Sequence, residues 1–549
     1  MGILTYLLGS WVALGIGHKT IKKPLEELVE VNEDAITPAR QKNDGRDFTP
    51  TNKYVLFGHH WMSVAGTTAI VASIIGLIWG WLPSLVWMLV GVHLIGATND
   101  YFSLMLSVKN EGKSLGQIAK ENINKNTGKL LSILYFVASI LVTAMFIVVM
   151  TGTLVDVPEA GVPVLSLIPI SMLFGICLKK GYPLLITTLA CVVVILGVCG
   201  IGANFPLVFS YNTWLIIFVI YTLFAMTLPV WLLLAPRDYL NTTLVIGGMI
   251  LAAVSLLIVR PPILMPAFVG FNTVRGPLWP MIMATITCGA ASGVHGLISS
   301  GTTSKQLSNE KDGYFVAFGG MQGETLMAGI SAAMIMVLFT YDQFLERAYV
   351  NAGAAFSAAM GNCLTMLGIN PVWATTIGAL TFSALLLTTL DSWARAGRYV
   401  MEEMAPDRSR IKKNVWASSA LYMVIVVVVM LTVPYMDLWS GIAIGSLTLL
   451  LVPLALMLIK RYKENKVFDF KFVIFVLLPI CIVYPSAVAA VLYQMVGFLN
   501  SRNWVSLAML IFMICTIGFL TVYTVHKMMA IKRERREAIP EGSRYSGSC

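Results

Sequence analysis

Long apolar runs follow one another along the whole chain, and short polar segments separate them. A helix that crosses the hydrocarbon layer of a membrane needs about 20 mostly apolar residues. The pattern therefore predicts an all-α polytopic membrane protein with about 15 transmembrane helices. The predicted spans are residues 3–17, 55–80, 84–108, 130–152, 162–178, 183–202, 213–235, 243–260, 279–300, 315–340, 372–390, 415–435, 438–460, 472–495 and 504–526. Residues 352–366 are small and only mildly apolar, so we expect a re-entrant or surface helix there.

The composition agrees with a membrane protein. Of the 549 residues, 57% are hydrophobic and 12% are charged, whereas soluble domains carry about 25% charged residues. The first apolar stretch, Ile3 to Ile16, is short and is soon followed by His18 and Lys19, so a signal-like or interfacial segment is the alternative to a first span. The eight cysteines are scattered without a C-x-x-C pair, so we expect neither a disulfide framework nor a zinc–thiolate site.

The basic residues predict an orientation in the membrane. Loops on the cytoplasmic side of a membrane protein carry an excess of Lys and Arg. With the N-terminus outside and alternating spans, only four of the 38 Lys and Arg residues fall in outer loops, namely Arg260, Arg275, Arg347 and Arg502. We therefore predict a multi-pass protein of the inner (plasma) membrane with a cytoplasmic C-terminus. These loops also explain the net charge of +10, so nucleic acid is not expected as a partner and the lipid bilayer is.

A pattern of eleven residues occurs twice. Residues 58–68 and 293–303 both read G-x-H-x5-G-T-T. The two copies lie seven predicted spans apart, so their helices run antiparallel, which is the relation expected of an inverted repeat. Paired, glycine-interrupted helices in two such halves typically form the binding site of a secondary transporter. We divide the chain into a first span with a polar cytoplasmic segment (1–54), two halves of a transport core (55–278 and 279–526, the second with accessory helices) and a charged cytoplasmic tail (527–549).

The motif residues are the predicted substrate-binding site. Glycine beside threonine allows a helix to break, and a broken helix exposes free N–H groups that attract an anion. A close helix crossing built from small residues is the alternative. The candidate site residues are His60, Gly66, Thr67, Thr68, His295, Gly301, Thr302 and Thr303.

Histidine titrates near neutral pH, so His60 and His295 are candidate proton carriers or substrate donors, and the alternative is a neutral imidazole hydrogen-bonded between helices. A metal site formed by His59, His60 and His295 is the weaker interpretation, since adjacent histidines point to different helix faces. We therefore expect no metal and no cofactor.

Three acids in or at the end of apolar runs are candidates for proton or ion coupling. Asp100 and Glu324 each lie in the span that follows a motif helix. An ionised carboxylate inside a membrane is costly unless it is paired, so a structural pair with a basic residue is the alternative role. Asp391 precedes Arg395 by one helical turn, and the simplest interpretation is an i,i+4 pair. The chain has no G-x-S-x-G, H-E-x-x-H or Walker A sequence, so an enzyme is not expected.

Several stretches resemble the carbon-starvation (CstA) family of membrane transporters. They spread over roughly residues 37–400 and read TPARQKNDGRD (37–47), KYVLFGHH (53–60), WLLLAPRDYL (231–240), CGAASGVHGLISSGTT (288–303), GGMQGE (319–324) and LDSWARAGR (390–398). The resemblance implies proton-driven uptake of pyruvate or short peptides, a leucine-transporter-like core, and acids at Asp100, Glu324 and Asp391. The chain departs from the family at residues 65–70, which read AGTTAI instead of AGAGPL, and after Asp391, where Ser-Trp-Ala-Arg replaces Ala-Gly-Thr-Arg.

These observations predict a secondary active transporter that couples protons to uptake of a small carboxylate nutrient such as pyruvate. Two alternatives stay within transport: a short-peptide transporter, and a symporter coupled to sodium through threonine hydroxyls and backbone carbonyls. Two others lie outside it: a nutrient sensor, and a membrane enzyme with a histidine metal site.

Overall fold

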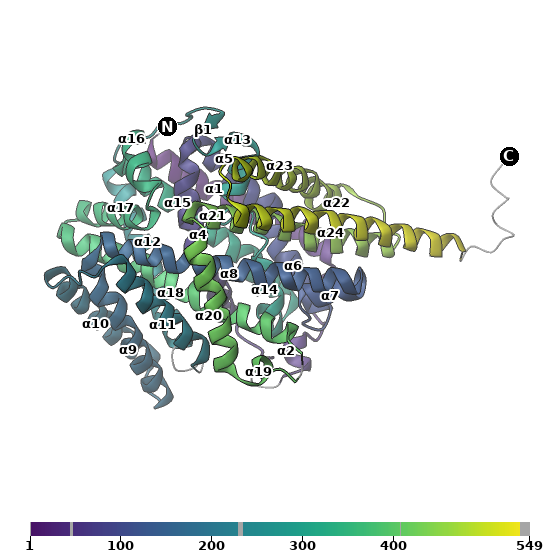
Figure 1. Ribbon diagram of the computed structural model, residues 1–549, viewed down its shortest axis with the longest axis horizontal. Helices are drawn as coiled ribbons and strands as arrows, with labels where there is room; N and C mark the ends of the chain where they lie inside the picture. Colours follow the sequence, from purple (N-terminus) through teal and green to yellow (C-terminus); the bar gives the residue numbers. More distant parts are fainter. Residues whose placement is uncertain (1, 44–47, 229–233, 407, 538–549) are drawn as a thin grey trace.

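Helices make up nearly all the regular structure of the computed structural model, which describes residues 2–43, 48–228, 234–406 and 408–537 (Figure 1). Within these residues, eleven helical stretches are long and apolar enough to cross a membrane. They are α5 (Trp81–Gly91) continued by α6 (Ala97–Lys109), α8 (Lys125–Asp156), α9 (Gly161–Lys179), α10 (Leu184–Asn204), α12 (Leu234–Val259), α15 (Gly319–Leu338), α18 (Pro371–Met404), α20 (Val415–Thr432), α21 (Tyr435–Lys463), α23 (Leu478–Asn500) and α24 (Trp504–Glu537). The chain is therefore a multi-pass membrane protein.

Each of these eleven stretches overlaps a predicted span, and the remaining four predicted spans differ. Residues 55–80 form a pair of helices, α3 (Lys53–Val64) and α4 (Thr67–Gly76), bent by 52°, and count as a twelfth span only if the pair is taken as one. Residues 3–17 begin α1 (Ile3–Val29), whose second half is polar. Residues 213–235 overlap α11 (Tyr211–Thr227), which has only 17 residues, and residues 229–233 of this span lie outside the described part of the chain. Residues 279–300 are divided between α13 (Leu278–Thr285) and α14 (His295–Gly301). The count of 15 spans is thus not confirmed.

The shorter elements connect and cover these helices. They are α2 (Pro38–Gln41), α7 (Leu115–Asn122), α16 (Tyr341–Gln343), α17 (Ala352–Met366), α19 (Arg410–Lys413), α22 (Phe470–Phe472) and an antiparallel ribbon of β1 (Asn272–Thr273) and β2 (Gly276–Pro277). Helix α17 has the predicted bounds, and most of its side chains are buried against α18 and neighbouring helices, so of the two predicted placements, re-entrant or surface, the surface placement was wrong. Its many Ala and Gly residues explain this close packing.

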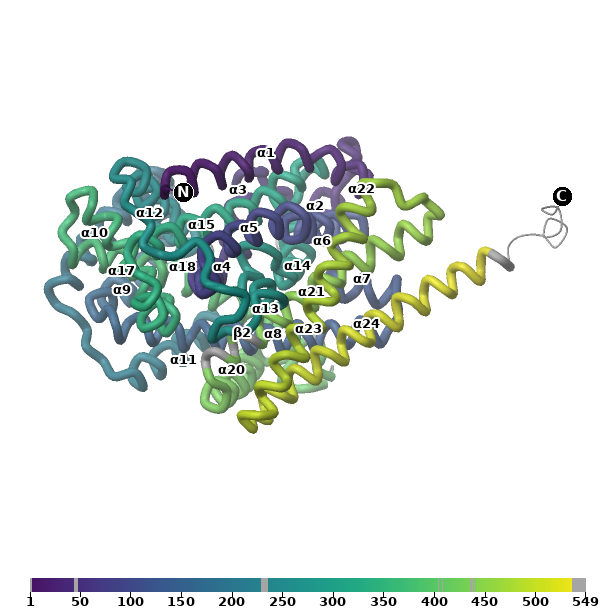
Figure 2. The backbone as a smooth tube through the Cα atoms, turned by 90° about the horizontal axis from the view of Figure 1, so that it is seen from above, coloured from purple at the N-terminus to yellow at the C-terminus, as the bar shows by residue number. Residues whose placement is uncertain are grey.

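Burial separates central helices from peripheral ones. In α21, 94% of the apolar stretch is buried, against 28% in α10. Helices α9, α10 and α11 lie together at one end of the molecule, and α24 projects from the other end (Figures 1 and 2). Helix α1 runs along one face and packs on α15 (Figure 2). The exposed apolar side chains of the peripheral helices are what lipid contact requires.

Of four π-helical turns among the described residues, two lie shortly before the acids predicted from the sequence. One, Val92–Gly96, joins α5 to α6 and lies one turn before Asp100. The other, Tyr314–Phe318, leads into α15 six residues before Glu324. Such turns are rare and frequently lie at functional sites. Both of the central acids predicted from the sequence thus follow an irregular turn.

Candidate functional site

The first predicted helix break is present at its predicted place. Helix α3 ends at Val64, and α4 begins at Thr67 after Gly66, whose extended backbone (φ −73°, ψ 169°) cannot continue a helix. The first turn of α4 has no side-chain cap. Thr67 and Thr68 are buried in this turn, and the Thr67 hydroxyl has no hydrogen-bond partner among the described residues. A side chain at Gly66 would come within 3.0 Å of Thr389 on α18, so α18 closes over the break.

The second break lies elsewhere than predicted. Gly301 is the last residue of α14, Thr302 caps its C-terminus, and Thr303 begins a short 3₁₀ turn. The chain is instead unwound upstream, over residues 286–294, between α13 and α14. We call these residues the unwound segment. The prediction failed because Gly301 keeps a helical conformation, whereas Gly289 has a φ of +85° that L-residues rarely adopt.

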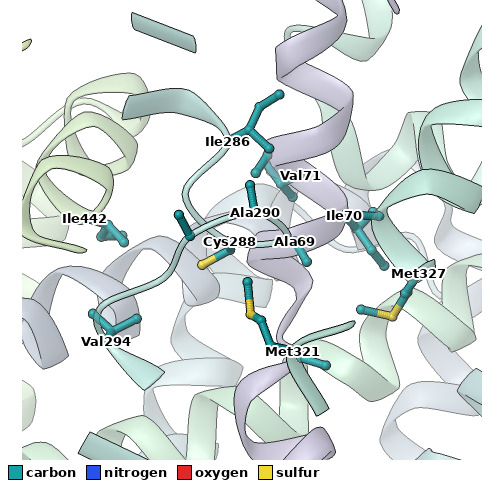
Figure 3. Close-up of a cluster of buried hydrophobic side chains, with 14 of the residues drawn as sticks. Ala69, Ile70, Val71, Ile286, Cys288, Ala290, Val294, Met321, Met327 and Ile442 are labelled. Carbon is teal, nitrogen blue, oxygen red and sulfur yellow. The ribbon is translucent and has the colours of Figure 1, made fainter. Parts of the chain in front are cut away.

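The unwound segment passes through the middle of the packed helices. A Cβ atom at Gly289 would lie 3.0 Å from the Cβ of Ala328 on α15 and 3.7 Å from that of Ala69 on α4. At its end, the Gly293 N–H donates to the Ser446 hydroxyl on α21 at 3.0 Å. Figure 3 shows the segment crossing α4 beside Ala69, with apolar side chains on both sides. The two breaks are thus neighbours in the fold.

Three of the predicted residues form one buried cluster, which we call the central cluster. His295 begins α14, Asp100 comes from α6 and Glu324 from α15. The His295 Nδ1 atom lies 3.0 Å from Asp100 Oδ2, and its Nε2 atom lies 3.4 Å from Glu324 Oε2. The side chains of Asp100 and Glu324 are completely buried and that of His295 is 2% exposed. One imidazole therefore stands between two carboxylates away from water.

The central cluster is not fully hydrogen-bonded. Among the described residues, Asp100 Oδ1, His295 Nε2 and both carboxylate oxygens of Glu324 have no hydrogen-bond partner. Buried polar atoms are nearly always paired, and an unpaired buried charge costs several kcal/mol, on the order of 3–5. The cluster therefore needs a cation, either a proton or a metal ion, to lower this cost.

The other motif histidine has a different partner. His60 on α3 is fully buried, and its Nδ1 atom lies 2.9 Å from the Thr303 hydroxyl. The structure thus joins one residue from each copy of the repeated pattern. His59, the neighbour of His60, is exposed, whereas His60 and His295 are buried.

Asp391 belongs to a separate cluster. Its carboxylate accepts hydrogen bonds from the guanidinium of Arg237 on α12 and, at 2.9 Å, from the Tyr221 hydroxyl on α11. The expected partner Arg395 instead donates to the backbone carbonyls of Ala225 and Leu228, at 2.6 and 2.7 Å. The predicted i,i+4 pair of Asp391 with Arg395 was therefore wrong. Arg395 binds backbone carbonyls at the end of α11, and the sequence alone does not reveal that this end lies nearby.

Sequence reasoning missed two residues that lie at these clusters, Cys288 and Arg237, and also missed Gln322. No cysteine was expected at a site, yet the Cys288 sulfur lies near the central cluster. Arg237 and Gln322 were passed over inside quoted motifs. The available signal for Arg237 was an arginine directly beside an apolar run, and the structure shows that it is fully buried, which is rare for an arginine without a partner.

The chain is similar to known proteins over its first two thirds. Residues 8–347 match the family described as "Carbon starvation protein CstA". A "Peptide transporter CstA" of Escherichia coli is 37% identical over 56% of this chain and 47% of its own length. Another protein of that name, from Bacillus subtilis, is 35% identical over 63% of this chain and 60% of its own length. A "Pyruvate/proton symporter BtsT" of Escherichia coli is 35% identical over 56% of this chain and 46% of its own length.

The chain spans about half the length of these two Escherichia coli relatives. Among solved structures, a manganese transporter mutant from Eremococcus coleocola aligns with a TM-score of 0.44 and 12% identity over 87% of this chain and 94% of that chain. At that score the likeness says nothing about function.

Proposed function

The chain belongs to the carbon starvation protein family, and we propose that it is a proton-coupled secondary transporter that takes up a small carboxylate nutrient such as pyruvate by alternating access. The relative named as a pyruvate/proton symporter supports the choice of substrate and coupling ion. Two features together support the proposal. One is a broken helix, and the other is a buried cluster of two acids and a histidine that is not fully hydrogen-bonded.

The substrate carboxylate would bind at the start of α4. Free N–H groups at a helix N-terminus carry partial positive charge and favour an anion. Gly66 opens the break, and the Thr67 hydroxyl has no partner among the described residues, so it is free to donate a further hydrogen bond. His60 lies one turn before the break on α3, and its bond to Thr303 links this end of α3 to the end of α14. The departure from the family at residues 65–70 would then set substrate preference.

The coupling proton would bind in the central cluster. With a neutral histidine, Asp100 and Glu324 together carry two buried negative charges, which is unfavourable in a low-dielectric interior. Taking up a proton lowers that cost and favours the closed conformation, while exposure to water on the other side favours release. Since Asp391 is already paired with Arg237, we place the coupling proton in the central cluster and give Asp391 a structural role.

The two halves of the core would be related as an inverted repeat. Their two breaks lie beside each other, yet they differ in length and in position relative to the G-T-T residues. We therefore expect the halves to move against one another about the unwound segment. Gly301 and Thr302 would then lie at the end of α14 that moves, and Thr303 would connect that end to His60 on α3.

The test is uptake of labelled pyruvate into proteoliposomes that hold the purified protein, with and without an inward proton gradient. We expect accumulation that a protonophore abolishes. Glu324→Gln should lose accumulation against a gradient, because the amide cannot take up a proton, whereas the exposed control Glu346→Gln should keep it. Full proton-driven accumulation by the Glu324 variant would contradict this role.

A second candidate substrate is a short peptide, because most of the similar relatives are named peptide transporters. A peptide also carries a carboxylate, and its amino group would need an acid such as Glu324 nearby. Di- and tripeptides that compete with pyruvate, or that are taken up when pyruvate is not, would favour this alternative. Replacement of sodium by choline would abolish uptake only if sodium, not the proton, is the coupling ion.

A further inference from the structure

A cysteine joins the central cluster from the unwound segment. Cys288 Sγ, a ring nitrogen of His295 and a carboxylate oxygen of Glu324 all lie within 4.8 Å of one another, and all three residues are buried. The Cys288 sulfur otherwise contacts only a hydroxyl among the described polar groups, that of Ser292 at 3.6 Å. Thiolate, imidazole and carboxylate are the three protein ligands of zinc.

The distances suit ligands of a single ion. Two ligand atoms about 2.0–2.1 Å from one tetrahedral zinc ion lie about 3.3 Å apart. The distance between His295 Nε2 and Glu324 Oε2 is 3.4 Å, yet these two atoms form no hydrogen bond with each other. The sulfur lies within 4.8 Å of both other ligand atoms, and Cys288 lies outside any helix, so its backbone can shift without disrupting a helix.

The outer partner of the histidine also fits a metal site. Metal-binding histidines almost always donate their other ring N–H to a carboxylate or carbonyl, which fixes the tautomer and leaves the second nitrogen free for the ion. Here Asp100 Oδ2 lies 3.0 Å from His295 Nδ1, so Nε2 is the nitrogen that faces Glu324. The unpaired oxygens of Glu324 and the unpaired Nε2 of His295 are all more than nine-tenths buried.

We infer that Cys288, His295 and Glu324 form a binding site for a divalent transition-metal ion with the ligand preference of zinc, with Asp100 as the outer partner of His295. A thiolate ligand favours such ions over magnesium and calcium, which prefer oxygen. Metal binding requires deprotonated ligands. If the proposed function is correct, the metal therefore competes with the coupling proton and inhibits uptake.

Binding is tested directly with Co²⁺ as the probe. The full-length protein, purified in detergent and treated with a chelator, is titrated with Co²⁺ while its absorption spectrum is recorded. We expect one equivalent to produce the thiolate-to-cobalt charge-transfer band and the visible bands of tetrahedral cobalt, and Zn²⁺ to remove both. Cys288→Ser should abolish the charge-transfer band, whereas Cys363→Ser, a control at an equally buried cysteine on α17, should keep it.

Two further variants test the ligand set without touching the cysteine. Glu324→Gln should weaken cobalt binding by more than the roughly 10–100-fold that loss of an outer-shell partner costs, and Asp100→Asn should weaken it by about that amount. Thermal unfolding of each variant checks that it is folded. A wild-type protein without a charge-transfer band, or a band that survives Cys288→Ser, would overturn the inference.

This experiment separates the metal site from the proposed transport activity. Cobalt binding without pyruvate uptake would leave the metal site standing and refute the proposed function. Uptake that Zn²⁺ inhibits in the wild type and in Cys363→Ser, but not in Cys288→Ser, each measured relative to the same variant without metal, would tie the two together. Equal inhibition of all three proteins would show that zinc acts elsewhere and would overturn the competition.

Discussion

Two clusters of buried ionic residues in the described part of the chain differ in their hydrogen bonding. In the Asp391 cluster, the carboxylate is held by Arg237 and Tyr221. In the central cluster, both oxygens of Glu324 lack a hydrogen-bond partner among the described residues. A buried ion pair mainly offsets its own desolvation, whereas a buried acid without a partner gains from binding a cation. The Asp391 cluster is therefore suited to stabilising the fold, and the central cluster is suited to binding a cation.

Removing one member of the Asp391 cluster should destabilise the fold. Arg237→Met leaves the carboxylate of Asp391 buried without its cation, which costs about 3–5 kcal/mol. The double variant Arg237→Met with Asp391→Leu removes both charges and should recover most of the loss, since an apolar pair of similar size is often neutral or stabilising. Thermal unfolding of the purified proteins in detergent measures both effects.

The control for that experiment is Arg260→Met, which changes an exposed arginine and should leave the unfolding temperature unchanged. A double variant as unstable as the single one would show that the cluster does more than pair its own charges. In that case Asp391 would return as a candidate for the coupling site.

At the residue scale, the sequence was a good guide to chemistry and a poor guide to partners. Asp100, His295 and Glu324 could be found because a titratable residue inside an apolar run is rare and needs a reason. Cys288 and Arg237 were missed because their roles depend on which elements meet, and no motif in the sequence links Cys288 to Glu324 on another helix. Which distant helices come into contact depends on how they pack, and a single sequence does not reveal this packing.

At the scale of single elements, the breaks decide the architecture. The first could be predicted because Gly66 precedes two threonines at the start of an apolar helix. The second was misplaced by about ten residues, since two glycine-containing stretches lie close together and only the backbone distinguishes them. Gly289 has φ +85° and a Cβ contact of 3.0 Å, whereas Gly301 has open space around it and a helical conformation.

Alanine at these two glycines should therefore give opposite results. Gly289→Ala forces a left-handed conformation on a residue with a side chain, at a cost of about 1–2 kcal/mol, and presses its methyl group against Ala328. Gly301→Ala should be neutral or slightly stabilising, because alanine is favoured over glycine in a helix by about 0.5–1 kcal/mol. Thermal unfolding measures both, and a more harmful change at Gly301 would favour the break predicted from the sequence.

One glutamine links helix α1 to two central elements by hydrogen bonds. The Gln322 Nε2 atom donates to the Leu14 carbonyl at 3.0 Å and lies 3.0 Å from His93 Nε2, while its Oε1 atom lies 2.6 Å from His18 Nδ1. This single side chain thus joins α1, the π-helical turn before α6, and α15. The contacts explain why a helix with a polar second half packs against central elements.

Gln322→Leu should loosen α1 without unfolding the core. The substitution leaves the polar partners of Gln322 without a hydrogen bond, and each such group lowers the free energy of unfolding by about 1–3 kcal/mol. We expect faster hydrogen–deuterium exchange over α1, with little change in α21. Gln494→Leu is the matched control, since that glutamine is about equally buried, 9% against 8% exposed, but lies on α23. Unchanged exchange in α1 would show that its apolar face alone holds it.

For the whole molecule, composition and apolar periodicity were sufficient to predict the fold class, and every predicted span corresponds to a helix or a broken helix. The span count was not confirmed because α1 is partly polar and α11 is short, and length alone does not decide whether a helix crosses the bilayer. The burial of α17 could not be foreseen, since small residues suit both a surface turn and a tight helix contact.

The orientation in the membrane is the prediction that belongs to the molecule as a whole. Ion pairs join loops that the sequence assigns to the cytoplasm, as in Lys109 with Glu310 and Lys53 with Asp312. Loops assigned to the outside are joined by hydrogen bonds, since the Asn351 amide donates to Asp156 at 2.6 Å and the Asn503 amide donates to Asp437 at 2.5 Å. Loops of each set therefore lie together, as the alternating topology requires, but this agreement does not say which set faces the cytoplasm.

Labelling of single cysteines decides between the two orientations. Val274 is 78% exposed in a loop assigned to the outside, and Val467 is 82% exposed in one assigned to the cytoplasm. In a protein whose exposed Cys481 and Cys515 are changed to Ser, a membrane-impermeant maleimide should label Val274→Cys in intact cells. It should label Val467→Cys only after the cells are permeabilised. The reverse result would invert the topology, and because the proton gradient has a fixed direction, it would also change which end of the central cluster receives the coupling proton.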